Sequence, residues 1–527
     1  MEPVPLPAPF AGVNERLPTI ALQSPNCADS LNFNPEQEGM VLRYGDSKFS
    51  TFTLAGTSDP MGLYAYGNTK LFTACYKAFG GGIAFIDAET GAVAYTTGNQ
   101  LSITAVSSML FNNYLFFFFN TSTFAPGYVW DGAAMGASGY TGTNLWPIGG
   151  AVFNHRAYMI QLNEAAYWYS PIDAISGACT KVDLTTVISE KATLSIIASF
   201  TLSDQVTTQR VQTFIFSTGE VLFYSGSYPN GPDWTNIGSA KIGQPLFIQS
   251  VIPYQGDTLV MCDAGVVSLR DLFLKGSQQA MGLSVNDNSN KTWQALVKDI
   301  RRILNTPTGP ITGGYLVGNI RGVYDPKTDR IIISFPYYLS SGVATTGSYY
   351  FVFNNQLKSW VFHQSGGGTV LGTFTVYDMV SYKNKVITLG KSSNSTTYMH
   401  WSKEGSTGFT DRDETDSSDR TYNYVLESAP ISNGRAYIQK AEGMDVIVES
   451  DLYAQTNYKF IRDFGVGETT AQLIASQPTG VQKPFVNMGI EGSFIQYKIY
   501  GTTTSGKTVG YKLYGTNIWI SQGNSPR

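Results

Sequence analysis

The sequence predicts an all-β protein, and three observations carry this prediction. The 527 residues include 54 glycines and 13% aromatic side chains, but only 14% charged ones. Such a composition favours pleated, half-buried surfaces joined by frequent turns. Short apolar runs alternate with polar turns from about residue 60 to about residue 410. A single stretch, Asn290–Asn305, has the apolar spacing of a helix.

The central part, residues 56–410, repeats a crude strand–turn–strand unit, as in LFNNYLFFFF and SYKNKVITLG. The closer spacings fit the period of about 40–50 residues that is typical of propeller blades. We therefore expect a β-propeller of about seven blades, within a range of six to eight, because radial closure protects the edges of many short strands. An array of β-sandwiches is the alternative. The turns that define the units are Gly67-Asn68, Asn112-Asn113, Asn154-His155, Thr218-Gly219, Gly256-Asp257, residues 326–329 and Lys383-Asn384.

Residues 1–55 precede the repeats as an N-terminal arm with platform strands. A Pro-rich opening is followed by short predicted strands over Asp29–Asn34, Gly39–Tyr44 and Phe49–Leu54. Together these segments predict an extended, β-rich entry to the chain.

Residues 411–421 form a polar linker, and residues 422–527 form a closing β module. The linker does not match an EF-hand loop, so we expect a solvated connection and no calcium site. In the module, FIQYKIYGTT and YKLYGTNIWIS alternate around Ser505-Gly506, which predicts a hairpin. The acidic residues of the linker are Asp411, Asp413, Glu414, Asp416 and Asp419. The predicted strands of the module are Tyr422–Leu426, Ala436–Gln439, Met444–Glu449, Asn457–Asp463, Phe494–Tyr500 and Tyr511–Ile520.

The helical stretch is expected near residues 292–305. Its apolar residues, from Trp293 to Leu304, fall on one face, and Pro307 ends it. Lys298, Arg301 and Arg302 lie off that face. The simpler hypothesis is a helix packed against the propeller, and the sharper one is a basic contact to DNA or to a neighbouring subunit.

The stretch Val221–Gly265 combines several unlike turns within one run of strands. Val221–Tyr224, Leu246–Tyr254 and Leu259–Cys262 are apolar enough for buried strands, and Trp234 is a large anchor. The Pro229–Trp234 and Ile242–Pro245 segments between them are interpreted as the connection between two blades, with no catalytic role.

The order of these turns resembles the tail hub, or nozzle, proteins of short-tailed bacteriophages. Those proteins have a Tyr-x-Gly-x-x-Pro segment, a Trp about five residues later, an Ile-Gly-x-Pro segment, a Gly-Asp turn and an Asp-Gly turn. This chain departs at the last turn, where Ala264 is inserted. The opening around Gly12-Val13-Asn14 and Leu31-Asn32 is also similar to the start of that family. The matching residues of the central stretch are Tyr224, Gly226, Pro229, Trp234, Ile242, Gly243, Pro245, Gly256, Asp257, Asp263 and Gly265.

The resemblance implies a structural protein of the virion tail. The N- and C-terminal segments would combine into a platform beside the propeller, and a helix would follow the Asp-Gly turn. Identical subunits would form a homohexameric ring around the channel for DNA ejection, with transient, non-specific contact to genomic DNA. The partners implied are the head–tail adaptor under the portal and tail fibres or spikes. The place implied is the virion tail, after assembly in the host cytoplasm.

No pattern in the sequence indicates catalysis, a cofactor or a metal. His155, His363 and His400 are far apart, and no phosphate loop, zinc-protease motif or nucleophile elbow is present. Asp257, Asp263 and Asp325 fall in turns, where carboxylates bond to backbone. Trp130, Trp146 and Trp234 are interpreted as core anchors. The dispersed Cys27, Cys75, Cys179 and Cys262 predict buried free thiols made in a reducing cytosol.

Two function classes stay open. A net charge of −4 gives no basis for tight binding to nucleic acid, and neither a signal peptide nor a span of 18 apolar residues is expected. The first hypothesis is the non-enzymatic tail nozzle or hub. The alternative is a carbohydrate-binding or glycan-cleaving propeller, which the aromatic loops favour and the missing acidic repeat disfavours.

Overall fold

The computed structural model describes most of the chain. The ranges described are 2–9, 11, 13, 26–43, 46–49, 58–77, 83–96, 103–121, 127–203, 208–246, 250–276, 293–298, 320–336, 348–364, 375–391, 397–402, 411–412, 419–420, 423–431, 439–450, 456–465, 467–469, 472–473, 481–503 and 511–522. Strands predominate in these ranges, as the sequence predicts. They form many separate sheets, none of which closes into a barrel within the ranges described.

Seven groups of antiparallel strands, here called sheets 1 to 7 in chain order, occupy residues 46–48 and the described parts of residues 58–402. Sheet 1 contains β6 (Ser58–Tyr66), β7 (Lys70–Lys77), β8 (Ile83–Asp87) and β9 (Val93–Thr96), and sheet 2 contains β10 (Ile103–Phe111), β11 (Tyr114–Thr121), β12 (Tyr128–Trp130) and β13 (Met135–Ala137). Sheet 3 contains β15 (Pro147–Phe153), β16 (Arg156–Gln161), β17 (Ala166–Tyr169) and β19 (Thr180–Asp183), and sheet 4 contains β20 (Leu194–Ser203), β21 (Thr208–Phe216), β22 (Glu220–Ser225) and β23 (Thr235–Lys241). Sheet 5 contains β24 (Val251–Tyr254), β25 (Asp257–Cys262) and β26 (Gly265–Ser268), and sheet 6 contains β27 (Arg321–Asp325), β28 (Arg330–Pro336), β29 (Ser348–Asn354) and β30 (Ser359–Gln364). Sheet 7 contains β31 (Thr375–Tyr382), β32 (Lys385–Lys391), β33 (Thr397–Ser402) and, from the N-terminal arm, β5 (Asp46–Lys48).

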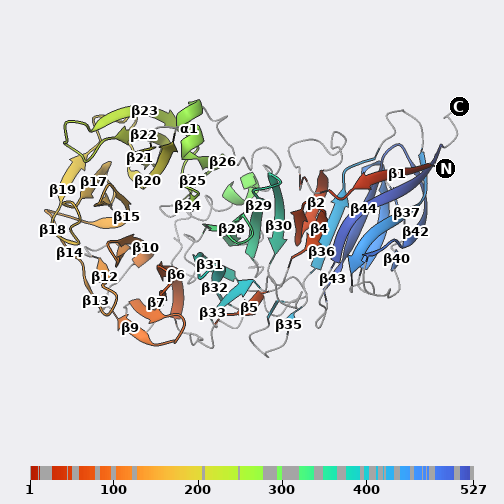
Figure 1. Cartoon of the computed structure of the whole chain (residues 1–527), viewed down its shortest axis with the longest axis horizontal. Coiled ribbons are helices and arrows are strands. Elements are labelled where there is room, and N and C mark those ends of the chain that lie inside the picture. The colour runs from red at the N-terminus through yellow and green to blue at the C-terminus, as the bar shows by residue number, and fades with distance from the viewer. Residues whose placement is uncertain are drawn as a thin grey trace.

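The seven sheets follow one another around a ring, from sheet 1 in orange to sheet 7 in cyan (Figure 1). Neighbouring sheets touch through their inner strands: β6 contacts β10, β10 contacts β15, and β15 contacts β20. The succession continues from β20 to β25, from β24 to β27 and from β27 to β31, and β31 contacts β6. Apolar cores fill the spaces between sheets; Phe72 and Phe85 of sheet 1, for example, pack against Phe117 of sheet 2. The arrangement buries both faces of central strands such as β8 and β16, which agrees with the low content of charged residues.

The predicted turns lie between consecutive strands of one sheet. Asn112 and Asn113 join β10 to β11 with φ of 47° and 62°, and Lys383 and Asn384 join β31 to β32 with φ of 48° and 57°. Positive φ at both central positions is the geometry of the tight hairpin turn that matches strand twist, and Asn tolerates it. The polar pairs therefore marked the hairpins correctly.

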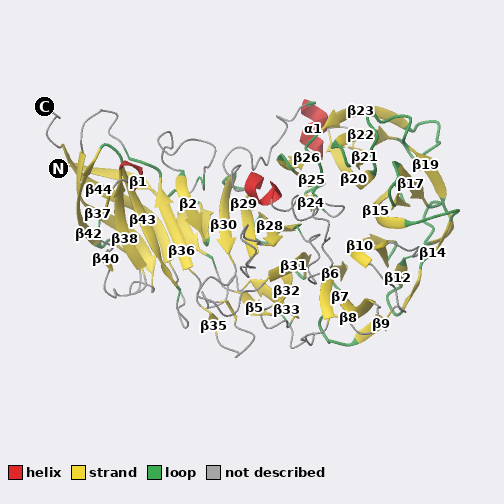
Figure 2. Ribbon diagram, turned by 180° about the vertical axis from the view of Figure 1, so that it is seen from behind, coloured by secondary structure: helices red, strands yellow, loops and turns green. Residues whose placement is uncertain are grey.

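A platform of two further sheets lies beside the ring, and it contains the first and the last described strands of the chain (Figures 1 and 2). One sheet contains β1 (Glu2–Pro7), β3 (Phe33–Glu36), β4 (Gly39–Leu42), β37 (Gln439–Ser450), β41 (Val481–Gln482), β42 (Phe485–Gly492) and β44 (Tyr511–Gln522). The other contains β2 (Cys27–Leu31), β36 (Asn423–Ser428), β38 (Thr456–Arg462), β39 (Gly467–Glu468), β40 (Gln472–Leu473) and β43 (Ile495–Thr502). The second sheet continues sheet 6, because β2 pairs with β30 through Leu31 and Phe362.

The two platform sheets pack face to face through aromatic side chains. Phe33 meets the rings of Tyr424 and Tyr511 edge-on at 5.8 and 6.1 Å between centroids. The hydroxyls of Tyr458 and Tyr511, one from each sheet, lie 2.8 Å apart and share a hydrogen bond. The phenols can therefore be buried without leaving these polar atoms unsatisfied.

Three sequence-based predictions need correction in these regions. The strand expected over Asp29–Asn34 is broken at Asn32, whose φ is 63°, so that β2 and β3 join different sheets. The strands on either side of Ser505-Gly506 do not form a hairpin: β43 pairs with β36 and β38, whereas β44 pairs with β37. Alternation of apolar and polar residues identifies a strand but not its partner, and here the chain crosses from one sheet to the other.

The third correction concerns the helices. Residues 293–298 are helical, inside the predicted segment. A helix that the sequence analysis missed, α1 (Leu269–Lys275), follows β26 directly. Ser268 caps its start by accepting a hydrogen bond from the Asp271 amide, and Gly276 ends it with φ of 65°. These capping residues were a readable signal, but the helix has only seven residues and no long apolar period.

Two small ribbons complete the described strands. β14 (Gly139–Thr141) pairs in parallel with β18 (Ser176–Ala178), and β34 (Asp411–Arg412) pairs with β35 (Asp419–Arg420). The second ribbon occupies the ends of the predicted acidic linker. No helix in the described part of the chain is long and apolar enough to cross a membrane.

Candidate functional site

The described structure contains a cavity of about 200 Å³ at the centre of the ring. Every one of the seven sheets contributes to its lining, which combines apolar side chains, glycines, two serines and one ion pair. The lining residues include Leu63, Ser107, Ser108, Gly150, Ile197, Val251, Arg321, Asp378 and Met379.

Asp378 is the most connected polar side chain of this cavity. Its carboxylate accepts hydrogen bonds from the Leu63 amide at 2.7 Å and from its own neighbour, the Met379 amide, at 2.7 Å. The Nε of Arg321 lies 2.7 Å from Oδ1, and Nη2 lies 3.3 Å from Oδ2. Burial raises the pKa of Asp378, while the Arg321 guanidinium acts in the opposite direction. The carboxylate thus joins β6, β27 and β31, strands of three different sheets.

Two other polar groups of the cavity bond to backbone carbonyls of a neighbouring sheet. The Ser107 hydroxyl donates to the Ile148 carbonyl at 2.8 Å, and the Tyr64 hydroxyl donates to the Val106 carbonyl at 2.9 Å. Neither His nor Cys is among the described lining residues. Both hydroxyls are therefore used in contacts between neighbouring sheets.

The sequence analysis singled out neither Asp378 nor Arg321. Asp378 is the one charged residue of the apolar strand TVYDMVSY, and a lone charge in such a strand is a signal that could have found it. Arg321 shares RGVYD with Asp325 and gives no such signal. Their pairing could not have been read, because 57 residues separate them.

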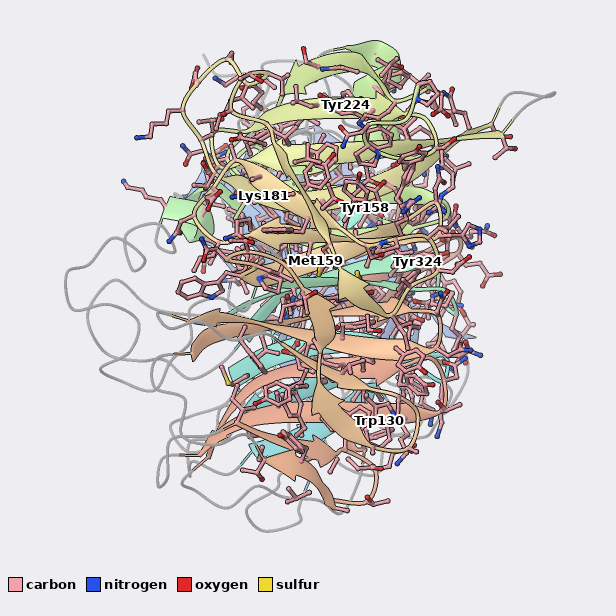
Figure 3. The ribbon with its side chains drawn as sticks, turned by 90° about the vertical axis from the view of Figure 1, so that its left-hand side faces the viewer. Trp130, Tyr158, Met159, Lys181, Tyr224 and Tyr324 are labelled. Atoms are coloured by element: carbon pink, nitrogen blue, oxygen red, sulfur yellow. The ribbon has the colours of Figure 1, made fainter. Side chains whose placement is uncertain are left out.

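The motif stretch forms a packed junction between sheets 3 and 4. Trp234 stacks on Tyr224 with 5.4 Å between ring centroids, and also on Tyr158 at 6.4 Å (Figure 3, where both tyrosines are labelled). The Tyr169 hydroxyl donates to the Pro229 carbonyl at 3.2 Å. Pro229–Trp234 lies within the β22–β23 hairpin and does not connect two sheets, which corrects that interpretation. The sequence did not reveal this hairpin, because its loop is longer than an ordinary hairpin turn.

Glycines in this stretch stand where other backbone segments come close. A methyl group on Gly226, whose φ is 131°, would lie 2.5 Å from the Asp233 carbonyl oxygen. One on Gly243 would lie 2.8 Å from the Ala264 nitrogen. Ile242–Pro245 does connect sheets 4 and 5, as expected, and Pro245 forms an isolated bridge with Cys262.

The Gly256-Asp257 turn supports helix α1. The central residues are Gln255 and Gly256, with φ of 45° and 75°. Asp257 is buried and accepts hydrogen bonds from the Ser268 hydroxyl and from the Arg270 amide. Burial raises its pKa, although these donors act in the opposite direction. The carboxylate therefore has a structural task at the start of a helix.

The predicted basic helix is attached to the last turn of the motif. Trp293 Nε1 donates to the Cys262 carbonyl at 3.1 Å, and Gln294 Nε2 donates to the Asp263 carbonyl at 3.0 Å. Gly265 has φ of 133° in this turn. Lys298 is exposed, while Arg301 and Arg302 lie outside the described residues.

The remaining candidates are dispersed. His155 is exposed beside Asp173, burial lowers the pKa of His363 well below its usual range, and His400 belongs to β33. Trp130 is buried against Phe72. Among the described residues, no group of three or more His, Cys, Asp or Glu could hold a metal ion.

Turn geometry accounts for Asp325, and the cysteines are not paired. The Asp325 carboxylate accepts from the Lys327 amide at 3.1 Å and from the Thr328 hydroxyl at 2.8 Å.

All four cysteines are free thiols; Cys179 is partly buried and the other three are buried. Asp413, Glu414 and Asp416 of the predicted linker lie outside the described residues.

Comparisons with known proteins find structural neighbours without sequence relatives. No family model and no curated protein matches the sequence. BBS1N in complex with ARL6DN is 11% identical over 68% of this chain and 98% of that chain, with a TM-score of 0.38. A second neighbour is an exo-beta-1,3-galactanase from Phanerochaete chrysosporium, in the structure of a substituted form with beta-1,3-galactotriose. It is 8% identical over 80% of this chain and 96% of that chain, with a TM-score of 0.25. The structure of the same enzyme with galactose is 8% identical over 80% of this chain and 97% of that chain, with a TM-score of 0.24. Likenesses below a TM-score of 0.5 carry no inference.

Proposed function

We propose that sheets 1 to 7 are the blades of a seven-bladed β-propeller. The succession of contacts between inner strands, which returns from β31 to β6, supports this assignment. So does β5, which supplies the fourth strand of sheet 7 from a segment that precedes sheet 1. Such an exchange joins the first and last blades of a radial fold.

We further propose that the protein is a structural component of a virion tail, the nozzle or hub of a short-tailed bacteriophage. The observation that carries this proposal is the platform. β1 and β4 pair with β44, and β2 pairs with β36, so N- and C-terminal segments share both platform sheets. This is the combination that the resemblance implies, and the helical residues 293–298, which follow the Asp263–Gly265 turn in the chain, agree with it.

The proposed mechanism is mechanical. Six copies form a ring that surrounds a DNA channel. One face of this ring binds the adaptor below the portal, and fibres or spikes attach at its side. A closed ring needs two different, complementary faces on each subunit. The hydrogen-bonded polar groups of the central cavity agree with a scaffold role, because their hydrogen bonds hold strands in place.

Assembly on the native complex tests the function. The purified chain is mixed with a portal–adaptor complex from a short-tailed phage particle and imaged by electron microscopy. Sixfold density added below the adaptor is the expected result. Absence of addition, together with retention on a glycan array, overturns the proposal in favour of a carbohydrate-binding propeller.

The basic helix has a separate test. Reversing Lys298, Arg301 and Arg302 to Glu should impair DNA delivery or ring formation if this helix contacts DNA or a neighbouring subunit. Reversal of the exposed Lys181, which lies on sheet 3, is the control. Unchanged assembly and unchanged delivery would leave the helix with a packing role alone.

A further inference from the structure

The ring is closed at two points where its last sheet meets its first. At the outside, β5 pairs with β33 in sheet 7 before the chain continues into β6 of sheet 1. At the centre, β31 of sheet 7 contacts β6. Leu63 and Leu71 of sheet 1 share an apolar core with Ile387 of sheet 7.

Side chains bridge neighbouring inner strands at several places around the centre. Tyr64 joins sheet 1 to the Val106 carbonyl of sheet 2, and Ser107 joins sheet 2 to the Ile148 carbonyl of sheet 3. Thr258 of sheet 5 donates to the Ser199 carbonyl of sheet 4 at 2.8 Å. Each of these three bridges is a single neutral hydrogen bond, which contributes modestly to stability.

The bridge at the closing junction is charged and branched. Asp378 of sheet 7 accepts from the Leu63 amide of sheet 1 and holds the Arg321 guanidinium of sheet 6. The side chains of Arg321 and Asp378 retain exposures of only 12% and 2%. Hydrogen bonds to charged groups are about twice as strong as neutral ones, and removal of one partner leaves a buried charge uncompensated.

We propose that Asp378 is the latch of the ring: its carboxylate fastens the last sheet to the first, and Arg321 holds that carboxylate in position. The inference rests on contacts within one subunit and is independent of the proposed role in a virion. Gly62 is consistent with it, since a methyl group there would meet the Tyr64 hydroxyl first and would lie 2.9 Å from Asp378 Oδ2. The first sheet therefore leaves room for the carboxylate at its attachment point.

Hydrogen exchange of the full chain, followed by mass spectrometry, tests the latch. Asp378→Asn should accelerate exchange roughly a hundredfold in peptides of β6 and β31, because it leaves Arg321 without its charge partner. Peptides of β10 and β15 should exchange at the wild-type rate. Combining Asp378→Asn with Arg321→Met should recover part of the protection, since the uncompensated charge is then absent.

Ser107→Ala is the matched control, because it breaks a neutral bridge at another junction. It should accelerate exchange in β10 and β15 by about fivefold and leave β6 unchanged. If Asp378→Asn does not accumulate as folded protein, the double variant with Arg321→Met is compared with wild type and should still exchange faster in β6 and β31, because Asn offers the Leu63 amide only a neutral acceptor. Uniform acceleration in all sheets, or none in β6 and β31, would overturn the proposal.

Discussion

Single residues in the motif stretch act chiefly through the backbone. Gly226 and Gly243 leave space for other segments, Asp257 holds the start of α1, and Trp234 stacks on Tyr224. Each of these side chains, or the lack of a side chain at the two glycines, sets the distance between two segments of the backbone. The chemistry of the stretch is therefore that of an architectural motif.

Gly226→Ala should lower the free energy of unfolding by roughly 2–3 kcal/mol, because the new methyl group meets a carbonyl oxygen and the backbone conformation disfavours a side chain. Urea denaturation followed by circular dichroism measures the change. Gly136→Ala is the matched control: nothing lies within 4 Å of the added methyl group, and we expect a change within about 0.5 kcal/mol. Equal losses would contradict the close approach.

Asp87 should make stability depend on pH. Burial alone raises its pKa, but the Lys70 ammonium and the amides of Thr90 and Glu89 outweigh that effect and lower the pKa. A lowered pKa contributes stability above the unfolded value, about pH 4, and the contribution disappears as the pH falls through the folded value. Asp87→Asn should therefore cost about 1–2 kcal/mol at pH 7 and progressively less towards pH 2.

Denaturation of both proteins across that pH range measures the difference. Lys70→Met removes one of the donors to Asp87 and should lose less at pH 7 than Asp87→Asn. A difference between wild type and Asp87→Asn that stays constant from pH 7 to pH 2 would show that Asp87 does not titrate as inferred.

Strands and turns follow from local sequence patterns, whereas the protection of a sheet edge depends on particular residues. β1 is paired with β44 on one side, and Pro3, Pro5 and Pro7 occupy every second position of it. In an antiparallel pair, alternate residues direct their amides away from the partner. Proline at each of these positions leaves the outer edge of β1 without donors, which discourages the addition of another strand.

Replacing Pro3, Pro5 and Pro7 together by Val should therefore promote association of the chain. Restored amides would offer a template for edge-to-edge pairing. Sedimentation velocity at matched concentrations would reveal a larger or broader species than wild type. Substituting Pro484 by Val serves as a control, because it lies before β42 and outside β1. Unchanged sedimentation of the triple variant would mean that the edge is protected by other means.

At the scale of the whole molecule, the two chain ends depend on each other. Both platform sheets contain strands from the first 43 residues and from the last 105, and Phe33 packs between Tyr424 and Tyr511. Sheet 6 runs on into the platform through β2. The ring and the platform therefore share a continuous sheet and a common core.

A chain that ends at residue 421 should consequently lose more than its C-terminal module. β2 would lose its partner β36 and β4 its partner β44, and the apolar faces now buried between the platform sheets would be exposed. We expect increased binding of a hydrophobic dye and a broadened thermal transition. A truncated chain that unfolds as sharply as the full chain, with no added dye binding, would contradict this dependence.

Alternation and Asn or Gly pairs are local properties of the chain, so the all-β class, the short strands and most of the hairpin turns could be predicted from the sequence. It also identified the helical segment around Trp293. Tertiary structure alone decided the partners: β43 and β44 lie in different sheets, β5 joins sheet 7, and Asp378 meets Arg321 and Leu63. The physical reason is that a strand presents the same hydrogen-bonding groups to any neighbour, so pairing is selected by burial across the whole fold.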